Sequence, residues 1–120
     1  MIRRTVLLSL ICTFFPVAQW ASASTNPITS LPHLAFKQMT CVMWAESRST
    51  VLKPNLDDNN ADGGSSGVFQ IEQPTWARWA PLVNVHVPVW RASYYQQQLV
   101  AVEIWKHDGF GPWKDDGCFG

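Results

Sequence analysis

The sequence predicts a small, mainly helical α+β domain with a minimal hairpin region and one disulfide. Two stretches, residues 34–47 and 93–108, carry helical patterns, whereas the part between them is rich in turn formers. A chain of 120 residues can build one hydrophobic core, and its 47% hydrophobic content is too high for a disordered protein. Its nine basic residues balance nine acidic ones without a basic block, so nucleic acid is not an expected partner.

The first 23 residues have the features of a secretory signal peptide. Two arginines precede an apolar run over residues 6–17, and small residues follow at 21–23. The run is too short to span a membrane and is broken by Pro16. We therefore expect residues 1–23 to be removed and the protein to be secreted or delivered to the cell wall, without stable membrane insertion.

Removal of the signal peptide changes the cysteine count from three to two. It also leaves seven basic residues against nine acidic ones. In an oxidising compartment Cys41 and Cys118 can pair, and the alternative is two separate buried thiols. The chain-entropy model gives a bridge across so long a loop on the order of 4 kcal/mol of stabilisation.

The domain is expected over residues 34–120, after an extended lead-in at 24–33. Its first helix covers residues 34–47, where helical spacing places Glu46 on the same face as a row of apolar residues: Ala35, Met39, Val42 and Met43. Turn formers from Ser47 onward end this helix. The apolar face therefore finishes in a carboxylate.

The middle of the chain contains mostly short elements. Residues 55–66 are almost wholly turn formers, and the apolar run 67–71 fits either a strand or a buried turn. Pro74 suits a first helical position, so a short helix is predicted over 74–80, ended by Pro81. Residues 81–90 are predicted to be a linking loop.

The last helix, over residues 93–108, has the clearest signals. Ser93 and Gln96 fit a capping box, and Gly109 fits a C-terminal cap. The residues expected on its packed face are Tyr95, Leu99, Val102 and Lys106. The tail after Gly109 contains too many helix breakers for regular structure, so the disulfide would hold it against the first helix.

Glu46 is the most informative candidate for chemistry. Burial among apolar side chains disfavours the charged form of a carboxyl group and raises its pKa. Such a group can act as a general acid near neutral pH. An ordinary exposed glutamate at a helix end is the alternative interpretation.

Six tryptophans remain after signal removal, which is more than a core of this size needs. Aromatic rings can stack on sugar rings, and packing accounts for others, such as Trp44 and Trp105. We assign Trp76 and Trp79 to a ligand cleft, because they follow the apolar run at 67–71.

Several fragments occur in a recognisable order: Cys41-Val-Met-Trp-Ala-Glu46-Ser47, Ser66-Gly67-Val-Phe-Gln70-Ile71, Pro74-Thr75-Trp76, residues 96–102, and residues 109–113 with Cys118. Together they resemble the small transglycosylase-like domains of the resuscitation-promoting-factor family, which belong to the lysozyme-like superfamily. The Glu-Ser pair followed by Gly-x-x-Gln-Ile is also similar to the broader lytic transglycosylase signature. The resemblance covers about residues 36–119.

The resemblance implies a lysozyme-like fold and a secreted enzyme that cleaves the glycan backbone of bacterial peptidoglycan. It implies that Glu46 is the catalytic acid, that Gln70 lies in the cleft and that Thr75 and Trp76 lie close to the bound sugar. It also implies a Cys41–Cys118 bridge. In many members the first cysteine directly precedes the catalytic glutamate, whereas here it lies five positions earlier, which moves it by roughly 140° around the helix.

Two reactions remain open for such an acid. A hydrolase adds a second carboxylate and a water molecule, whereas a lytic transglycosylase uses the same glutamate to deprotonate the sugar's own 6-hydroxyl. The carboxylates closest in sequence are Asp57, Asp58, Asp62 and Glu72, and none has the surroundings of a poised second group. The single-carboxylate route is therefore favoured. The alternatives are a muramidase, a non-catalytic glycan-binding module and, more remotely, a secreted inhibitor or adaptor.

Metal sites have little support in the sequence. Residues 58–63 match the first half of a calcium-binding loop, but its twelfth position is Phe69, which cannot ligate an ion. The three histidines, His33, His86 and His107, are scattered, and no cysteine pair has zinc-ligand spacing. We expect a monomer without cofactor or metal, whose partner is cell-wall peptidoglycan.

Overall fold

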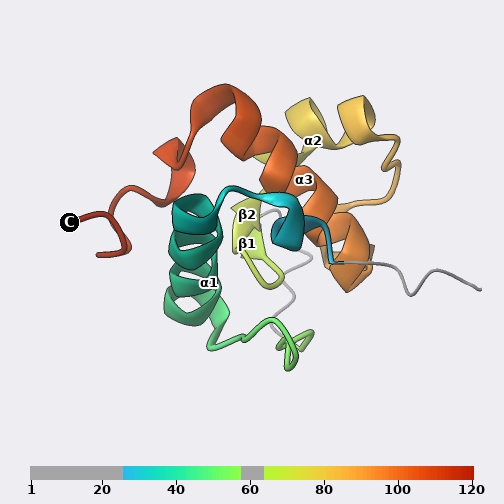
Figure 1. Ribbon diagram of the computed structural model, residues 1–120. Coiled ribbons are helices and arrows are strands. Elements are labelled where there is room, and N and C mark those ends of the chain that lie inside the picture. Colours follow the sequence, from blue (N-terminus) through green and yellow to red (C-terminus); the bar gives the residue numbers. More distant parts are fainter. Residues whose placement is uncertain (1–25, 58–63) are drawn as a thin grey trace, which may run out of the picture.

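Two helices of 15 residues each, α1 (His33–Ser47) and α3 (Tyr94–Asp108), frame the fold. The computed structural model describes residues 26–57 and 64–120; the predicted signal peptide and calcium-like loop lie outside that range. In Figure 1 a small hairpin lies between α1 and α3. The other elements in the described part of the chain are β1 (Ser65–Ser66), β2 (Ile71–Glu72), α2 (Gln73–Trp79) and four 3-10 turns: η1 (Pro27–Ser30), η2 (Ala80–Val83), η3 (Val89–Arg91) and η4 (Gly111–Trp113). The mainly helical fold class is confirmed.

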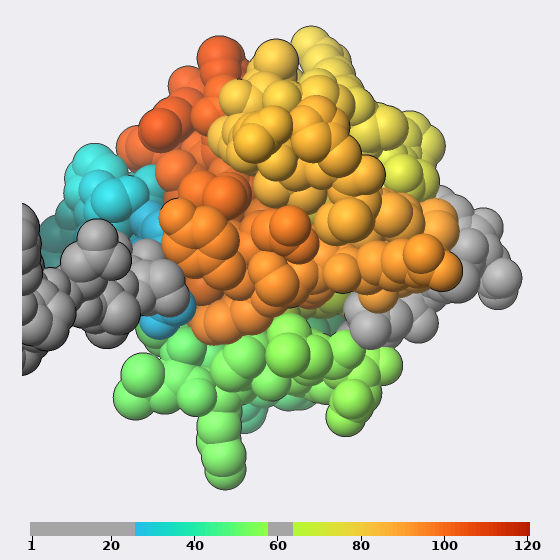
Figure 2. Space-filling view, turned by 90° about the vertical axis from the view of Figure 1, so that its right-hand side faces the viewer, coloured from blue at the N-terminus to red at the C-terminus, as the bar shows by residue number. Residues whose placement is uncertain are grey.

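The first helix forms where the periodicity predicts it. Its buried side chains are the four predicted apolar residues and Ser47, while Glu46 is half-buried beside them. Arg48 ends the helix in the left-handed conformation, with φ at 60°. The segment after α1 forms a separate ridge beneath the segments that lead into α3 (Figure 2).

The last helix confirms its predicted caps and half of its predicted face, since Val102 is buried and Leu99 packs against the core. Ser93 accepts from the backbone N–H of Gln96, and the Gln96 side chain accepts from the Ser93 N–H, which completes the capping box. Tyr95 is 45% exposed and Lys106 is exposed, so these two predicted face residues are wrong. The residues buried are Gln97, Gln98, Val100, Ala101, Val102 and Ile104.

Two buried glutamines explain that error. Gln97 accepts from the N–H of Val68 at 2.7 Å and donates to the Ala92 carbonyl at 3.0 Å. Gln98 accepts from the N–H of Ile28 at 3.3 Å. An amide side chain can be buried when its donors and acceptors are paired, so polar residues here join α3 to the hairpin and to η1.

The hairpin distinguishes between the two conformations predicted for residues 67–71, a strand and a buried turn. Strands β1 and β2 are antiparallel, with Ser65 opposite Glu72 and Ser66 opposite Ile71. Residues 67–70 form the turn between them, and Val68 and Phe69 within it are fully or almost fully buried. The apolar run is therefore a buried turn followed by the start of a strand.

The short helix α2 is confirmed within one residue of its predicted start. It ends at Trp79, but the chain continues directly into η2, with Pro81 in the first turn of this 3-10 helix. Proline lacks a backbone N–H, but the N–H groups in the first turn of a helix have no partner within the helix. Pro81 therefore fits the start of η2. The predicted loop over residues 81–90 is thus partly 3-10 helix.

The C-terminal tail is held against α1, as expected. Cys41 and Cys118 form a disulfide with a Cα–Cα distance of 5.8 Å. The tail also contains η4, which the sequence did not predict, and Trp113 in it is 2% exposed. Within the described residues, no helix combines the length and apolar character needed to cross a membrane.

Candidate active site

A polar cleft of about 280 Å³ lies where α1, the hairpin, α2 and the tail meet. Its lining residues come from all four segments: Glu46, Ser65, Gln70, Ile71, Glu72, Thr75, Pro112 and Trp113. Three of the residues that sequence reasoning selected, Glu46, Gln70 and Thr75, are thus brought together although up to 29 positions separate them in the chain.

Glu46 is placed by the residue that follows it. The Ser47 hydroxyl is buried and lies 3.2 Å from the Met43 carbonyl and 2.8 Å from the Val68 carbonyl. It is also 2.6 Å from the Ser49 hydroxyl, which in turn accepts from the Asn55 N–H. These bonds fasten the last turn of α1 to the hairpin turn, so that the half-buried Glu46 side chain lines the cleft.

Gln70 is held by a tight local fold. Its φ of 46° lies in the left-handed region, which is uncommon for a residue other than glycine. Its backbone N–H and its side-chain Nε2 both donate to the Gly67 carbonyl, at 3.2 and 2.9 Å. A positive φ at a cleft residue is a feature often found at functional sites.

Glu72 also lines the cleft, next to Thr75 on the following helix. It occupies the position that precedes α2 and is exposed. The sequence offered Glu72 as a carboxylate after the motif without placing it near Glu46. The described lining therefore contains two carboxylates and no Lys, Arg or His side chain, so its field favours positive charge.

Trp76 and Trp79 do not line this cleft. Trp76 is 1% exposed, and its indole N–H donates to the Val87 carbonyl at 2.8 Å in a different hollow. Trp79 is 7% exposed and stacks on His107 with ring centroids 4.9 Å apart, while the Arg78 guanidinium lies 4.8 Å from its ring centre. Both rings therefore serve packing between α2 and its neighbours.

The tryptophan in the cleft is Trp113, which sequence reasoning left among the quoted tail residues without a role. Its indole N–H donates to the Phe69 carbonyl at 2.9 Å, and its ring lies 6.4 Å from the ring of Phe69. The tail turn thus packs on the buried hairpin turn and closes one side of the cleft. Pro112 could have indicated the start of η4, but no local signal places the Trp113 ring in the cleft.

The described residues contain no cluster of metal-binding side chains. No three His, Cys, Asp or Glu side chains gather there in a way that could hold an ion. The calcium-like segment at 58–63 lies outside the described range.

The comparisons with known proteins identify no relative. No protein-family model, no curated protein and no solved structure matches the chain. The cleft and its residues are therefore the basis for assigning a function.

Proposed function

We propose that this protein is a secreted lytic transglycosylase that cleaves the glycan backbone of bacterial peptidoglycan between N-acetylmuramic acid and N-acetylglucosamine. The carrying observation is a half-buried glutamate, Glu46, in a polar cleft that also holds Gln70, Thr75 and Trp113. Cleavage of a glycosidic bond needs a carboxyl group that can donate a proton, and Gln70 and Thr75 beside it can hydrogen-bond sugar hydroxyl groups. The resemblance of the ordered sequence fragments to the resuscitation-promoting-factor family supports the same substrate.

In the proposed reaction Glu46 first acts as the acid. It donates its proton to the glycosidic oxygen, the bond from that oxygen to C1 of the muramic acid breaks, and positive charge develops on the ring. The Glu46 carboxylate then takes the proton from the 6-hydroxyl of the same sugar while that oxygen bonds to C1. The products are a 1,6-anhydro sugar and a free 4-hydroxyl on the leaving glucosamine, and Glu46 is protonated again.

A hydrolytic muramidase is the second candidate, and the position of Glu72 favours it. Glycosidases that add water use two carboxyl groups that flank the scissile bond. Glu46 and Glu72 reach one cleft from different elements, α1 and the strand β2. In that reaction Glu72 would activate the water molecule, and the product would carry a reducing end.

The deciding experiment is mass spectrometry of the fragments that the exported protein, residues 24–120, releases from purified peptidoglycan. Glu46→Gln is the test variant, because an amide can neither donate nor accept the required proton. Glu103→Gln is the matched control, since Glu103 lies on α3 and pairs with His107 at 2.9 Å, outside the cleft.

Each outcome assigns a different function. Anhydro-muramoyl ends from the wild type and the control, but not from Glu46→Gln, support the transglycosylase. Reducing ends with the same dependence on Glu46 support the muramidase. Folded protein that binds the wall but releases no fragment that depends on Glu46 would contradict both and identify a non-catalytic binding module.

A further inference from the structure

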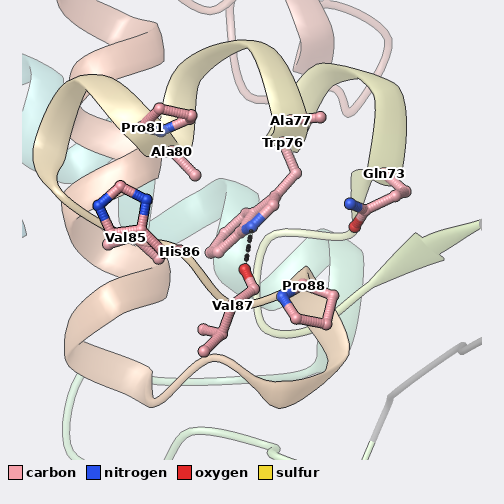
Figure 3. Close-up of a pocket in the computed structure, with 9 residues that line it drawn as sticks. All are labelled: Gln73, Trp76, Ala77, Ala80, Pro81, Val85, His86, Val87 and Pro88. Carbon is pink, nitrogen blue, oxygen red and sulfur yellow. Dashed lines mark hydrogen bonds between the residues drawn. The ribbon is translucent and has the colours of Figure 1, made fainter.

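A hollow of about 470 Å³ with a mostly apolar surface lies between the later turns of α1 and the segment that follows this helix. Leu52 in it is 90% exposed and Trp44 is 53% exposed, although both are large apolar side chains. The hollow beside α2 differs, because its Trp76 is buried and already bonded to the Val87 carbonyl (Figure 3). Of the two, the hollow at α1 therefore offers its apolar side chains to a partner. Its lining residues are Thr40, Trp44, Ser49, Thr50, Val51 and Leu52.

A closed turn holds Leu52 away from the body of the protein. The Thr50 N–H donates to the Lys53 carbonyl at 3.0 Å, and the Lys53 N–H donates to the Thr50 carbonyl at 3.2 Å. The Tyr94 hydroxyl donates to the Val51 carbonyl at 3.0 Å and ties this turn to α3. In Figure 2 the segment after α1 projects from the lower edge of the molecule. Leu52 is thus held at a projecting tip, outside the hydrophobic core.

Basic side chains flank this apolar pair. The Arg48 guanidinium lies 5.5 Å from the centre of the Trp44 ring, and Lys53 closes the turn at the tip. Residues 33–53 contain three Lys or Arg residues and a single acidic residue, which lines the cleft and not this hollow. Residues 64–120 contain four Lys or Arg residues and five acidic ones. The part of the chain that forms the hollow is therefore net basic, and its charge favours an anionic partner.

We propose that the surface formed by Trp44, Arg48, Leu52 and Lys53, here called the docking surface, binds reversibly to a bilayer that contains anionic lipids. Tryptophan is favoured at the boundary between lipid head groups and acyl chains, and a projecting leucine can enter the apolar region beneath it. Basic side chains beside them are attracted to anionic head groups. Such binding reaches one leaflet only and requires no helix that spans the membrane.

A second copy of the chain matches the docking surface less well. A symmetric pair would bring Arg48 and Lys53 of both copies together, and none of the described residues that line the hollow supplies a carboxylate to offset them. Stable protein interfaces also use about 20 residues on each side, whereas this hollow presents two large, exposed apolar side chains. A bilayer can be bound through a few inserted side chains and nearby positive charge.

The docking surface and the candidate active site lie on opposite sides of α1. Trp44 and Glu46 are two positions apart, which corresponds to a turn of about 200° around the helix axis. In the described chain no residue lines both hollows. A docked molecule therefore keeps its cleft open, and the proposed reaction would take place close to a membrane surface.

Co-sedimentation of residues 24–120 with lipid vesicles tests the proposal. Vesicles made of equal parts phosphatidylglycerol and phosphatidylcholine are compared with vesicles of phosphatidylcholine alone. The test variants are Leu52→Ala and Lys53→Gln. The matched controls are Leu82→Ala and Lys106→Gln, because Leu82 is 62% exposed in η2, Lys106 is exposed on α3, and neither lines the hollow.

We expect the wild type and both controls to bind the anionic vesicles about tenfold more tightly than the neutral ones. Leu52→Ala should weaken binding to anionic vesicles about tenfold, because the inserted side chain loses most of its apolar surface. Lys53→Gln should weaken it about fivefold, because one attraction to the head groups is lost. A wild type that does not bind anionic vesicles, or a Leu52→Ala variant that binds as tightly as the wild type, would overturn the proposal.

Two further measurements distinguish other partners. Lipids with brominated acyl chains should quench the tryptophan fluorescence of the wild type, and quenching should be weaker in Trp44→Phe. Binding to polyphosphate without such quenching would show that charge alone acts, and it would overturn the proposal. A dimer in sedimentation that Leu52→Ala abolishes, without binding of vesicles, would identify a second copy of the chain as the partner. None of these measurements uses a glycan, so failure of the docking surface and failure of the proposed reaction are observed separately.

Discussion

Glu72 is the residue whose placement most affects the choice of mechanism. It shares the cleft with Glu46, yet it is exposed, so water screens its charge more than that of its partner. In a transglycosylase its carboxylate would only offset the positive charge that develops on the sugar ring. In a muramidase it would be the base that activates water.

The substitution Glu72→Gln separates these roles. For a transglycosylase we expect a fall in kcat of about tenfold, with anhydro ends still formed, because only one electrostatic contribution is lost. Comparison of kcat and of the fragment ends with the wild type checks this. A fall of a thousandfold or more, together with reducing ends in the wild type, would contradict the single-carboxylate route.

Tyr94 gives a prediction on stability. Its hydroxyl donates to the Val51 carbonyl at 3.0 Å, and burial raises its pKa to about 12. A raised pKa means that the fold favours the neutral phenol, so this contribution is complete below pH 10 and is lost as the pH rises through 12. Tyr94→Phe should lower the free energy of unfolding by about 1 kcal/mol at pH 7.

Chemical denaturation at several pH values measures this effect. The gap between wild type and Tyr94→Phe should shrink between pH 10 and pH 12. Tyr95→Phe is the matched control, because Tyr95 is 45% exposed on the same helix turn and should change little. A gap that stays constant to pH 12 would contradict the raised pKa of Tyr94.

Among the elements, the hairpin turn depends most on a single residue. Gly67 has a φ of 79°, and an added Cβ would overlap the Gln97 side chain, whose Oε1 accepts from the Val68 N–H. Gly67→Ala should therefore cost roughly 2–4 kcal/mol, because strain adds to a broken buried hydrogen bond. Gly117→Ala is the control: its φ of 75° is similar, but nothing lies within 4 Å of the added Cβ.

Thermal unfolding of the two glycine variants checks this prediction. The control should lose only about 1–2 kcal/mol, the cost of a left-handed conformation for alanine. Equal losses in both variants would show that the contact with Gln97 does not fix the turn.

The elements differ in how far the sequence predicts them. Capping residues and apolar periodicity are local signals, so α1 and both ends of α3 were predicted within a residue or two. The packed face of α3 was predicted only in part, because Gln97 and Gln98 are buried through bonds to backbone atoms far away in the chain. Polarity alone assigns such residues to solvent.

At the scale of the whole molecule, the candidate site was only partly predictable. Glu46, Gln70 and Thr75 were selected by the resemblance and lie in one cleft. Trp113 lines this cleft, whereas Trp76 and Trp79 do not. The direction of each ring follows from tertiary packing, which no local sequence pattern encodes. The cleft depends on four segments that meet only in the folded chain.

The disulfide joins α1 to the tail, the first and the last of these four segments. It links residues 77 positions apart and holds the tail that carries Trp113 against α1. Replacing both Cys41 and Cys118 with serine should lower the free energy of unfolding by about 4 kcal/mol. Denaturation with and without a reducing agent measures this, and a wild type insensitive to reduction would contradict it.

The contact between Trp113 and Phe69 also has a consequence for how the protein is made. Chains are synthesised from the N-terminus, so Glu46 and the hairpin emerge well before the tail. Until Trp113 arrives to donate its hydrogen bond to Phe69, the cleft has no closing side. A nascent chain therefore carries Glu46 without a complete cleft, and the cleft is closed only after the last residues of the chain have been made.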